Sequence, residues 1–358
     1  MSQPHGAQSL RHWLIGLALS LALAWAAGAV FLDTVQPVAF DPQIGRYVAM
    51  PGTTSRTRGE GWASSNVGEH GIRGLPGGKL PAGPKVVFWG DSFVEGVQVD
   101  DADRMAQVFT SLSHTAGLNL TGVGIGHGGD TLIDNIFKAS DYASALGSVA
   151  LNVYFLGRIS DVLPDSPRPC RAAFYSTPEP HLRRNDCPPS DLALRFAPAL
   201  RSLEGASAFA AYLKLQALRL RLASGPGGTK QAPDAKAEAQ DLAPLWDFLI
   251  AEVRRASPGP VLFLYAPNVP ALTTGCVRTV DPDAATAEAF AAACQRNGVV
   301  FLNLGTIFMT TFESTGRFQS GFFNSPPGTG HLNEDGHRLV AQAVLQYIKE
   351  NRDALLAP

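Results

Sequence analysis

Three short stretches of the sequence carry residue types that could act together in nucleophilic catalysis. Ser92 follows the apolar run KVVFWG, where a buried strand would stop at a glycine. Gly129 lies in the glycine-rich stretch GIGHGGDT (124–131), and His331 lies in GTGHLNEDGH (328–337) near the C-terminus. A serine nucleophile needs a base that takes its proton and N–H donors for the developing oxyanion. Ser92 is a candidate for the nucleophile and His331 for the base.

Each of these residues also has an ordinary structural interpretation. Ser92 could be only a turn residue, and His331 could be only a surface histidine in a loop. Asn333 is suited to cap the helix that follows, and two acidic residues in its first turn suit the helix dipole. A loop histidine beside a capped helix is well placed to reach the first strand. His337 falls inside that helix, and we expect it to be structural.

Apolar runs alternate with helical patterns along most of the chain. Strands are expected at 86–89, 118–125, 148–156, 261–266 and 299–304, and helices at 103–112, 131–146, 241–256, 283–296 and 334–350. Such alternation predicts βαβ units and a parallel sheet covered by helices on both faces. Sites in these sheets lie at the carboxyl ends of the strands, which is where Ser92 and Gly129 fall.

The segment 13–32, WLIGLALSLALAWAAGAVFL, has no charged residue and would form a helix of about 30 Å. It predicts a transmembrane anchor, and a cleaved signal segment is the alternative because a small-x-small site, AWA, lies within it. Arg11 precedes the run and the next basic residue is Arg46, so the positive-inside rule leaves the N-terminus in the cytoplasm. Either interpretation exports the main domain.

The chain therefore divides into four predicted segments. They are a short cytoplasmic tail (1–12), the anchor or signal segment (13–32), an extended lead-in (33–84), and a catalytic domain (85–358) with an insertion at about 160–240. The insertion holds two of the cysteines, an apolar helical stretch and a polar linker. Its helical part could be a lid, a partner surface or plain packing.

The cysteine and charge content narrows the function classes. The four cysteines form no C-x-x-C pair, so a zinc site is not expected. Two local disulfides, Cys170–Cys187 and Cys276–Cys294, would suit an oxidising compartment. The net charge is −2, from 29 Lys and Arg against 31 Asp and Glu, which gives no electrostatic case for a nucleic-acid partner.

GDSF after the first strand, GGDT after the second and HLNEDGHRLVA at the last helix resemble motifs of the SGNH/GDSL hydrolase superfamily. The upstream NVGEHGIRG (66–74) resembles a lead-in of its membrane-anchored members. The resemblance covers the order of elements from about residue 84 onward. It implies a flavodoxin-like three-layer α/β/α fold with a five-stranded parallel sheet and no metal or other cofactor. It also implies Ser92 as nucleophile, His331 as base, and the N–H groups of Ser92 and Gly129 as oxyanion donors.

Two departures from the family pattern affect the expected site. The family has an asparagine after the third strand, whereas this chain reads FLGRISDV, with Arg158 as a substitute cation near that place. The family usually has an aspartate two or three residues before the histidine, where this chain has Thr329 and Gly328. A neighbouring carbonyl could orient the imidazole in a Ser-His dyad, or Asp161 could turn inward.

The resemblance implies an extracytoplasmic acyl-ester hydrolase or O-acyltransferase that acts on acetyl groups of an exported polysaccharide. It would sit in a bacterial inner membrane with its domain in the periplasm, or be secreted after signal cleavage. One alternative is a weakened or inactive domain that binds glycan or serves a polysaccharide synthesis or export complex. Another is a lipase or lysophospholipase. The expected partners are an acylated polysaccharide or other ester, the membrane and the export proteins.

Overall fold

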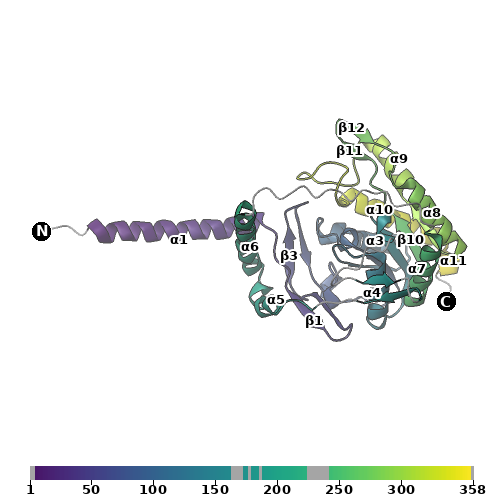
Figure 1. Ribbon diagram of the computed structural model, residues 1–358, viewed down its shortest axis with the longest axis horizontal. Helices are drawn as coiled ribbons and strands as arrows, with labels where there is room; N and C mark the ends of the chain where they lie inside the picture. The colour runs from purple at the N-terminus through teal and green to yellow at the C-terminus, as the bar shows by residue number, and fades with distance from the viewer. Residues whose placement is uncertain (1–4, 163–171, 176–178, 185–187, 224–241, 356–358) are drawn as a thin grey trace.

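The computed structural model describes residues 5–162, 172–175, 179–184, 188–223 and 242–355. One long helix, α1 (His5–Phe31), projects away from a rounded body that holds the remaining elements (Figure 1). Within its 23-residue segment Ser9–Phe31, an 18-residue stretch has a mean hydropathy of 2.2, and only 6% of that stretch is buried. By length and composition, α1 fits a membrane anchor or a signal sequence.

A five-stranded sheet forms the centre of the body. Its strands are β5 (Lys85–Gly90), β6 (Thr121–Gly126), β7 (Val149–Leu156), β10 (Val261–Tyr265) and β13 (Val300–Asn303). The strand order is β13-β10-β7-β5-β6, and every pairing is parallel. This is the strand order of flavodoxin-like sheets. The predicted fold class is confirmed.

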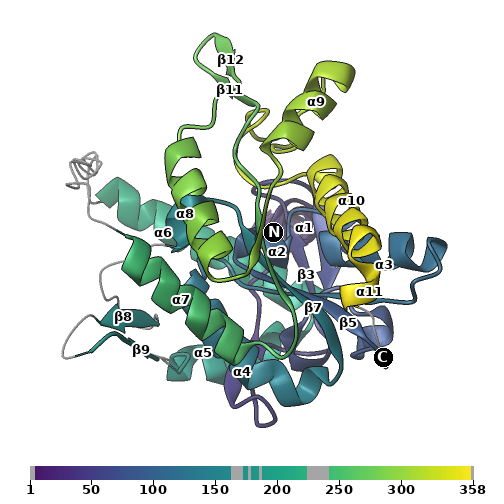
Figure 2. The same cartoon turned by 90° about the vertical axis from the view of Figure 1, so that its right-hand side faces the viewer.

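Helices cover both faces of the sheet and make two hydrophobic cores (Figure 2). One face packs on α4 (Leu132–Leu146), α7 (Ala243–Ala256) and α8 (Ala284–Arg296); the other packs on α3 (Met105–Thr115), α9 (Gly305–Thr315) and α10 (Glu334–Glu350). Alternate residues of β5 serve opposite cores, since Trp89 faces the first and Phe88 the second. Both faces being buried explains why the strands are almost continuously apolar in sequence.

The segment 33–84 is more structured than an extended lead-in. It contains two antiparallel hairpins, β1 (Val38–Asp41) with β2 (Arg46–Ala49) and β3 (Thr54–Thr57) with β4 (Ala63–Asn66). The second hairpin is tied to the domain, because the N–H groups of Ser64 and Asn66 donate to Asp100 and Asp101 at 2.9 and 3.0 Å. Four-residue strands show no sustained sequence period, so the sequence pattern did not predict them.

The insertion at about 160–240 holds short elements. They are a 3-10 turn (Ile159–Val162), β8 (Ala173–Tyr175), β9 (His181–Arg183), α5 (Asp191–Phe196), a second 3-10 turn (Ala199–Arg201) and α6 (Leu203–Ala223). A further hairpin, β11 (Ala271–Thr273) with β12 (Cys276–Arg278), follows β10, and α11 (Arg352–Leu355) ends the described chain. The predicted polar linker and the side chain of Asp161 lie outside the described residues.

The predicted Cys276–Cys294 disulfide is wrong, because both cysteines are free. Cys276 is exposed on the β11–β12 hairpin, whereas Cys294 is fully buried on the core face of α8. Burial raises the pKa of the Cys294 thiol to about 12, so this side chain acts as a small hydrophobic residue. The other predicted pair, Cys170–Cys187, lies outside the described residues.

His337 is a buried residue of α10, as expected, and it bridges to α3. It is 1% exposed, and its Nδ1 accepts a hydrogen bond from the backbone N–H of Met105 at 3.3 Å. Burial, together with the charges of Arg104 and His331, lowers the pKa of His337 to about 3. The folded protein therefore holds this imidazole neutral where an exposed histidine would take a proton.

We expect the free energy of unfolding to fall as the pH drops from about 6.5 toward 3, because the unfolded state then binds a proton that the folded state rejects. The slope from this group is at most about 1.4 kcal/mol per pH unit. His337→Asn keeps an acceptor for Met105 but removes the titration, so its slope should be smaller. Urea unfolding at several pH values measures both slopes, and equal slopes would contradict the assignment.

Candidate active site

Ser92 stands at the carboxyl end of the central strand β5. Asp91 caps the short helix α2 (Ser92–Glu95) by accepting a hydrogen bond from the N–H of Phe93 at 2.9 Å. Ser92 is therefore the first residue of a helix, where backbone N–H groups have no partner within the helix. β5 lies between β6 and β7, at the point where the strand order reverses, which is where ligands of such sheets bind.

His331 reaches Ser92 from the loop before α10. Its Nε2 lies 2.8 Å from Oγ of Ser92, and its ring packs on Phe93 with the ring centroids 5.0 Å apart. The loop is held by Asn333, whose side chain caps α10 and also donates to the carbonyl of Phe318 at 2.8 Å. The two residues that the sequence proposed as nucleophile and base are thus brought together.

The partner of the imidazole is Glu60, which the sequence analysis missed. Its Oε2 lies 2.6 Å from Nδ1 of His331, and its Oε1 accepts the backbone N–H of His331 at 2.9 Å. A carboxylate can only accept, so Nδ1 carries the proton and Nε2 is left to accept from the Ser92 hydroxyl. The structure thus completes a serine, histidine and carboxylate chain, in which Glu60 and not a neighbouring carbonyl contacts Nδ1 of His331.

Glycines explain why the carboxylate comes from a distant segment. At Gly330 a Cβ would overlap Oε1 of Glu60, so a side chain there would expel the carboxylate. At Gly328, one of the two places where the family would carry its aspartate, a Cβ would lie 2.7 Å from Cα of Ala271. The loop before α10 therefore has no room for a side chain at these two glycines, and the carboxylate that contacts His331 comes from Glu60 in a distant segment.

The turn that carries Glu60 is fixed on both sides. Asn324 accepts the N–H of Gly61 at 2.9 Å and donates to the carbonyls of Arg58 and Gly61 at 3.0 and 3.1 Å. On the other side, Oδ1 of Asp33 accepts the N–H groups of Arg58 and Gly59, the latter at 3.0 Å. Asp33 follows directly after α1, so the end of that helix is tied to the turn that presents the carboxylate.

The loop after β6 lies against Ser92. A Cβ on Gly128 would lie 3.9 Å from Cβ of Ser92, and the next residue is Gly129. In the described part of the chain, the backbone N–H groups of Ser92 and Gly129 have no hydrogen-bond partner. Both are thus available to an oxyanion, although the structure itself assigns no role to either.

A buried ion pair sets the position of that loop. Oε2 of Glu95 accepts the N–H of Gly128 at 3.0 Å, and Oε1 lies 3.2 Å from Nε of Arg73. Burial acts to raise the pKa of Glu95, but the charges of Arg73 and His127 and the Gly128 hydrogen bond lower it below its usual value. Arg73 belongs to the NVGEHGIRG motif, so this motif holds the glycine loop in place through the contact of Arg73 with Glu95.

Arg158 lies at the carboxyl end of β7, where the family would place its asparagine. Its side chain is exposed. Burial raises the pKa of Asp91, against the opposing charges of Arg158 and His331. These charges place Arg158 near the site edge, and its proposed part in oxyanion binding stays a prediction. No asparagine side chain of the described residues is recorded in contact with Ser92.

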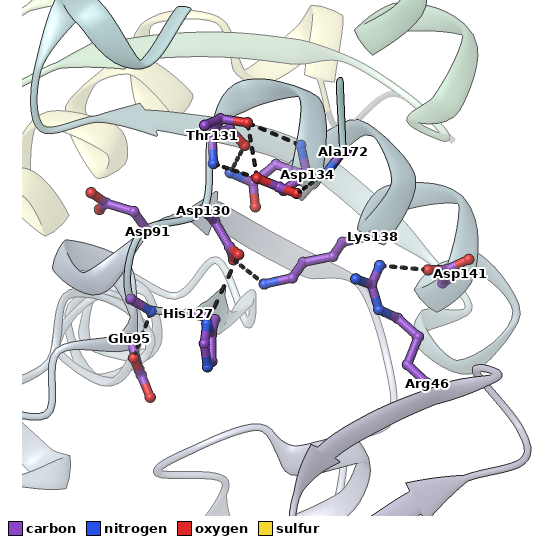
Figure 3. Close-up of polar contacts among 12 residues, drawn as sticks. Arg46, Asp91, Glu95, His127, Asp130, Thr131, Asp134, Lys138, Asp141 and Ala172 are labelled. Carbon is purple, nitrogen blue, oxygen red and sulfur yellow. Dashed lines mark hydrogen bonds and ion pairs between the residues drawn. The ribbon is translucent and has the colours of Figure 1, made fainter. Parts of the chain in front are cut away.

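A cavity of about 570 Å³ is lined by residues of the glycine loop, of α2 and of α4. Glu95, His127 and Asp130 line it, but neither Ser92 nor His331 does. In Figure 3 the side chain of Lys138 points to Asp130, with which it forms an ion pair. The exposed rings of Phe40 and Tyr47, 5.3 Å apart in an edge-to-face pair, also line the cavity.

The charges around this cavity are balanced. Its cations are paired as Arg73 with Glu95, Lys138 with Asp130, Arg46 with Asp141 and Arg104 with Asp101. Figure 3 shows Arg46 and Lys138 extending toward their acidic partners on the same side of α4. A cavity of this kind suits a polar and uncharged ligand better than a long hydrocarbon chain.

Solved structures with a similar arrangement include several esterases. A lipolytic protein of the G-D-S-L family from Veillonella parvula is 12% identical and matches 75% of this chain and 99% of its own, with a TM-score of 0.37. An acetylxylan esterase from Geobacillus stearothermophilus is 12% identical over 75% of this chain and 96% of its own, with a TM-score of 0.39. A second acetyl xylan esterase is 15% identical over 74% and 99%, with a TM-score of 0.41.

No family model matches the chain, and no curated protein matches it by sequence. Because the TM-scores and identities are low, the fold follows from the strand order of this chain and the chemistry from the geometry of its site.

Glu60→Gln should slow acylation of Ser92 by about 10²–10⁴-fold, because an amide cannot hold the required tautomer of His331. Hydrolysis of p-nitrophenyl acetate measures the effect. Glu350→Gln, an exposed change at the end of α10, is the matched control and should keep the rate of the unmodified protein. Equal rates in the two variants would show that Glu60 does not orient the imidazole.

Proposed function

We propose that the protein is a serine-dependent acyl-ester hydrolase or O-acyltransferase that works outside the cytoplasm on acetyl groups of a polysaccharide. The observation that carries the proposal is the unbroken hydrogen-bond chain from Oγ of Ser92 through His331 to Glu60, with distances of 2.8 and 2.6 Å. A serine hydroxyl is weakly nucleophilic until such a base takes its proton. The chain of contacts supplies the base and fixes its tautomer.

The reaction follows from these positions. Oγ of Ser92 attacks the ester carbonyl while Nε2 of His331 takes the hydroxyl proton. The resulting oxyanion is held by the N–H groups of Ser92 and Gly129, with Arg158 as a further cation. The ester C–O bond then breaks, and His331 returns the proton to the leaving alcohol. Water or a sugar hydroxyl next attacks the acyl-Ser92 ester by the same route, which gives hydrolysis or transfer.

The polysaccharide proposal is supported by the charge-balanced cavity beside the glycine loop. Such a cavity offers paired polar groups to hydroxyls and the faces of Phe40 and Tyr47 to sugar rings. A site for a long acyl chain should instead be apolar. The cavity therefore favours a glycan over the lipid substrate of a lipase. The two acetylxylan esterases agree with a glycan substrate only through their names.

A second candidate function is glycan binding without turnover, as part of a polysaccharide synthesis or export complex. The specific observation in its favour is the missing asparagine after β7, because the loss of one oxyanion donor costs about 10²–10³-fold in rate. The complete Ser92, His331 and Glu60 arrangement argues against it, since a binding domain has no need for that geometry.

Intact mass after exposure to a fluorophosphonate separates these two functions. An activated Ser92 should gain a single adduct, which Ser92→Ala should abolish. Ser111→Ala, an exposed change on α3, is the matched control and should react like the unmodified protein. If the unmodified protein gains no adduct while remaining folded, the enzyme proposal is rejected and the binding function becomes the better account.

Tyr47→Ala should raise KM for acetylated oligosaccharides by roughly 2–10-fold, which corresponds to about 0.5–1.5 kcal/mol for one aromatic contact. It should leave kcat/KM for p-nitrophenyl acetate unchanged, because this small ester does not reach the cavity. Parallel kinetics on the two substrates test the glycan assignment. Equal losses on both would mean that Tyr47 supports the fold and does not contact a glycan.

A further inference from the structure

The long helix α6 lies crosswise at the end of α1, on the side of the body from which α1 projects (Figure 1). The two helices pack against each other near the C-terminal end of α1. If a spanning helix runs close to the bilayer normal, a helix that crosses its end lies close to the plane of the bilayer surface. The position of α6 is therefore that of an interfacial helix.

Polar contacts fix α6 in this position. Nζ of Lys214 lies 2.8 Å from Oδ2 of Asp33, which is among the first residues after α1. The guanidinium of Arg56 on β3 donates to the carbonyl of Leu203 at 3.3 Å and to the hydroxyl of Ser207. The side of α6 that carries Ala206, Ser207 and Ala210 is buried by these contacts, so the remaining side faces outward.

The outward side is unusually apolar for a water-exposed helix. Tyr212 is 56% exposed and Leu215 is 60% exposed, and Leu213 and the α5 residues Leu192 and Phe196 are exposed as well. Scattered single apolar residues need no explanation, but these lie on two neighbouring helices. Exposed leucine and aromatic side chains beside the end of a spanning helix are in a position to enter the headgroup region of a bilayer.

The side chains packed on the C-terminal end of α1 are also of types that are common at membrane surfaces. Trp62 packs on Phe31 with the ring centroids 5.8 Å apart, and the guanidinium of Arg58 stacks on Trp62 at 4.3 Å. Nε of Arg58 also donates to the carbonyl of Val30 at 3.0 Å. Tryptophan and tyrosine concentrate at the headgroup level of membranes, where arginine and lysine also reach polar lipid atoms.

We propose that this face, made of α5, α6 and the Trp62 turn, rests on the surface of a lipid bilayer with α6 in the plane of the headgroups. The proposal requires α1 to be retained as a membrane anchor, and it does not depend on the chemistry at Ser92. It goes beyond anchoring, because it fixes which side of the domain meets the lipid.

The arrangement has a consequence for the site. Trp62 is two residues from Glu60, and Asp33 joins the turn of Glu60 to Lys214 of α6. The carboxylate that orients His331 is thus held directly by the membrane-facing elements. The candidate active site then stays at a fixed height and orientation above the bilayer, so a polymer substrate has to reach it along the membrane surface.

Photocrosslinking in a bilayer tests the proposal. The full chain is placed in vesicles of phosphatidylcholine and phosphatidylglycerol, with p-benzoylphenylalanine in place of Tyr212 or of Leu215. Irradiation followed by intact mass should show a lipid adduct at both positions. The same probe in place of Val280, which is 73% exposed two residues after the β11–β12 hairpin, should give none, because this hairpin lies at the upper edge of the body in Figure 1, away from α6.

A probe in place of Leu21 on α1 reports whether the anchor spans the bilayer. If it reacts with lipid while the probes at Tyr212 and Leu215 yield no more adduct than the one at Val280, the interfacial helix is rejected and the anchor stands. If the probe in place of Leu21 does not react with lipid, both the membrane anchor and the interfacial face are rejected. Because four separate exposed positions are used, misfolding of one variant, seen in its circular dichroism, does not decide the result. The fluorophosphonate reaction of Ser92 is unaffected by either outcome.

Discussion

The pair of hydrogen bonds between Glu60 and His331 is the constraint on which the rest of the site depends. One carboxylate oxygen accepts from Nδ1 of the imidazole and the other accepts from the backbone N–H of the same residue. The first bond selects the tautomer and the second fixes the loop, so ring and backbone are oriented by one side chain. Both bonds orient the imidazole so that Nε2 of His331 lies 2.8 Å from the Ser92 hydroxyl.

This constraint turns the N-terminal segment into part of the site. Glu60 is held by Asn324 on one side and by Asp33 on the other, which joins the C-terminal loop, the hairpin and the end of α1 around one turn. Arg73, from the same segment, holds Glu95 and through it the glycine loop. Both the base and the candidate oxyanion loop are thus oriented by residues that precede the sheet.

The oxyanion-binding part of the site lacks the side-chain donor of the family pattern, whereas the serine, histidine and carboxylate are all present. The N–H groups of Ser92 and Gly129 come from a helix N-terminus and a glycine loop, and such donors cost no side-chain entropy because they belong to the backbone. After β7, where the family would supply a side-chain donor, this chain has Arg158, whose charge acts on Asp91. A cation can offset the developing negative charge, but its flexible stem gives less directional stabilisation than an amide held in the wall of the site.

The sequence determined the sheet, because apolar strands and amphipathic helices have local periods that can be read without the fold. It also indicated the meeting of Ser92 and His331, since a histidine in the loop before the last capped helix is well placed to reach the end of the first strand. Glu60 could not be found in this way. It lies 32 residues before the serine and 271 before the histidine, in a segment of short strands with no sustained period. The only local signal is an acid between two glycines, Gly59 and Gly61, which marks a turn and does not identify the partner of that acid.

The free Cys276 and Cys294 show the same limit of sequence reasoning. The two cysteines are near each other in sequence, but this did not reveal that Cys294 lies in the core, apart from Cys276. Which distant carboxylate meets an imidazole is decided by tertiary packing, where the missing side chain of Gly330 leaves the space that Glu60 occupies in the folded chain.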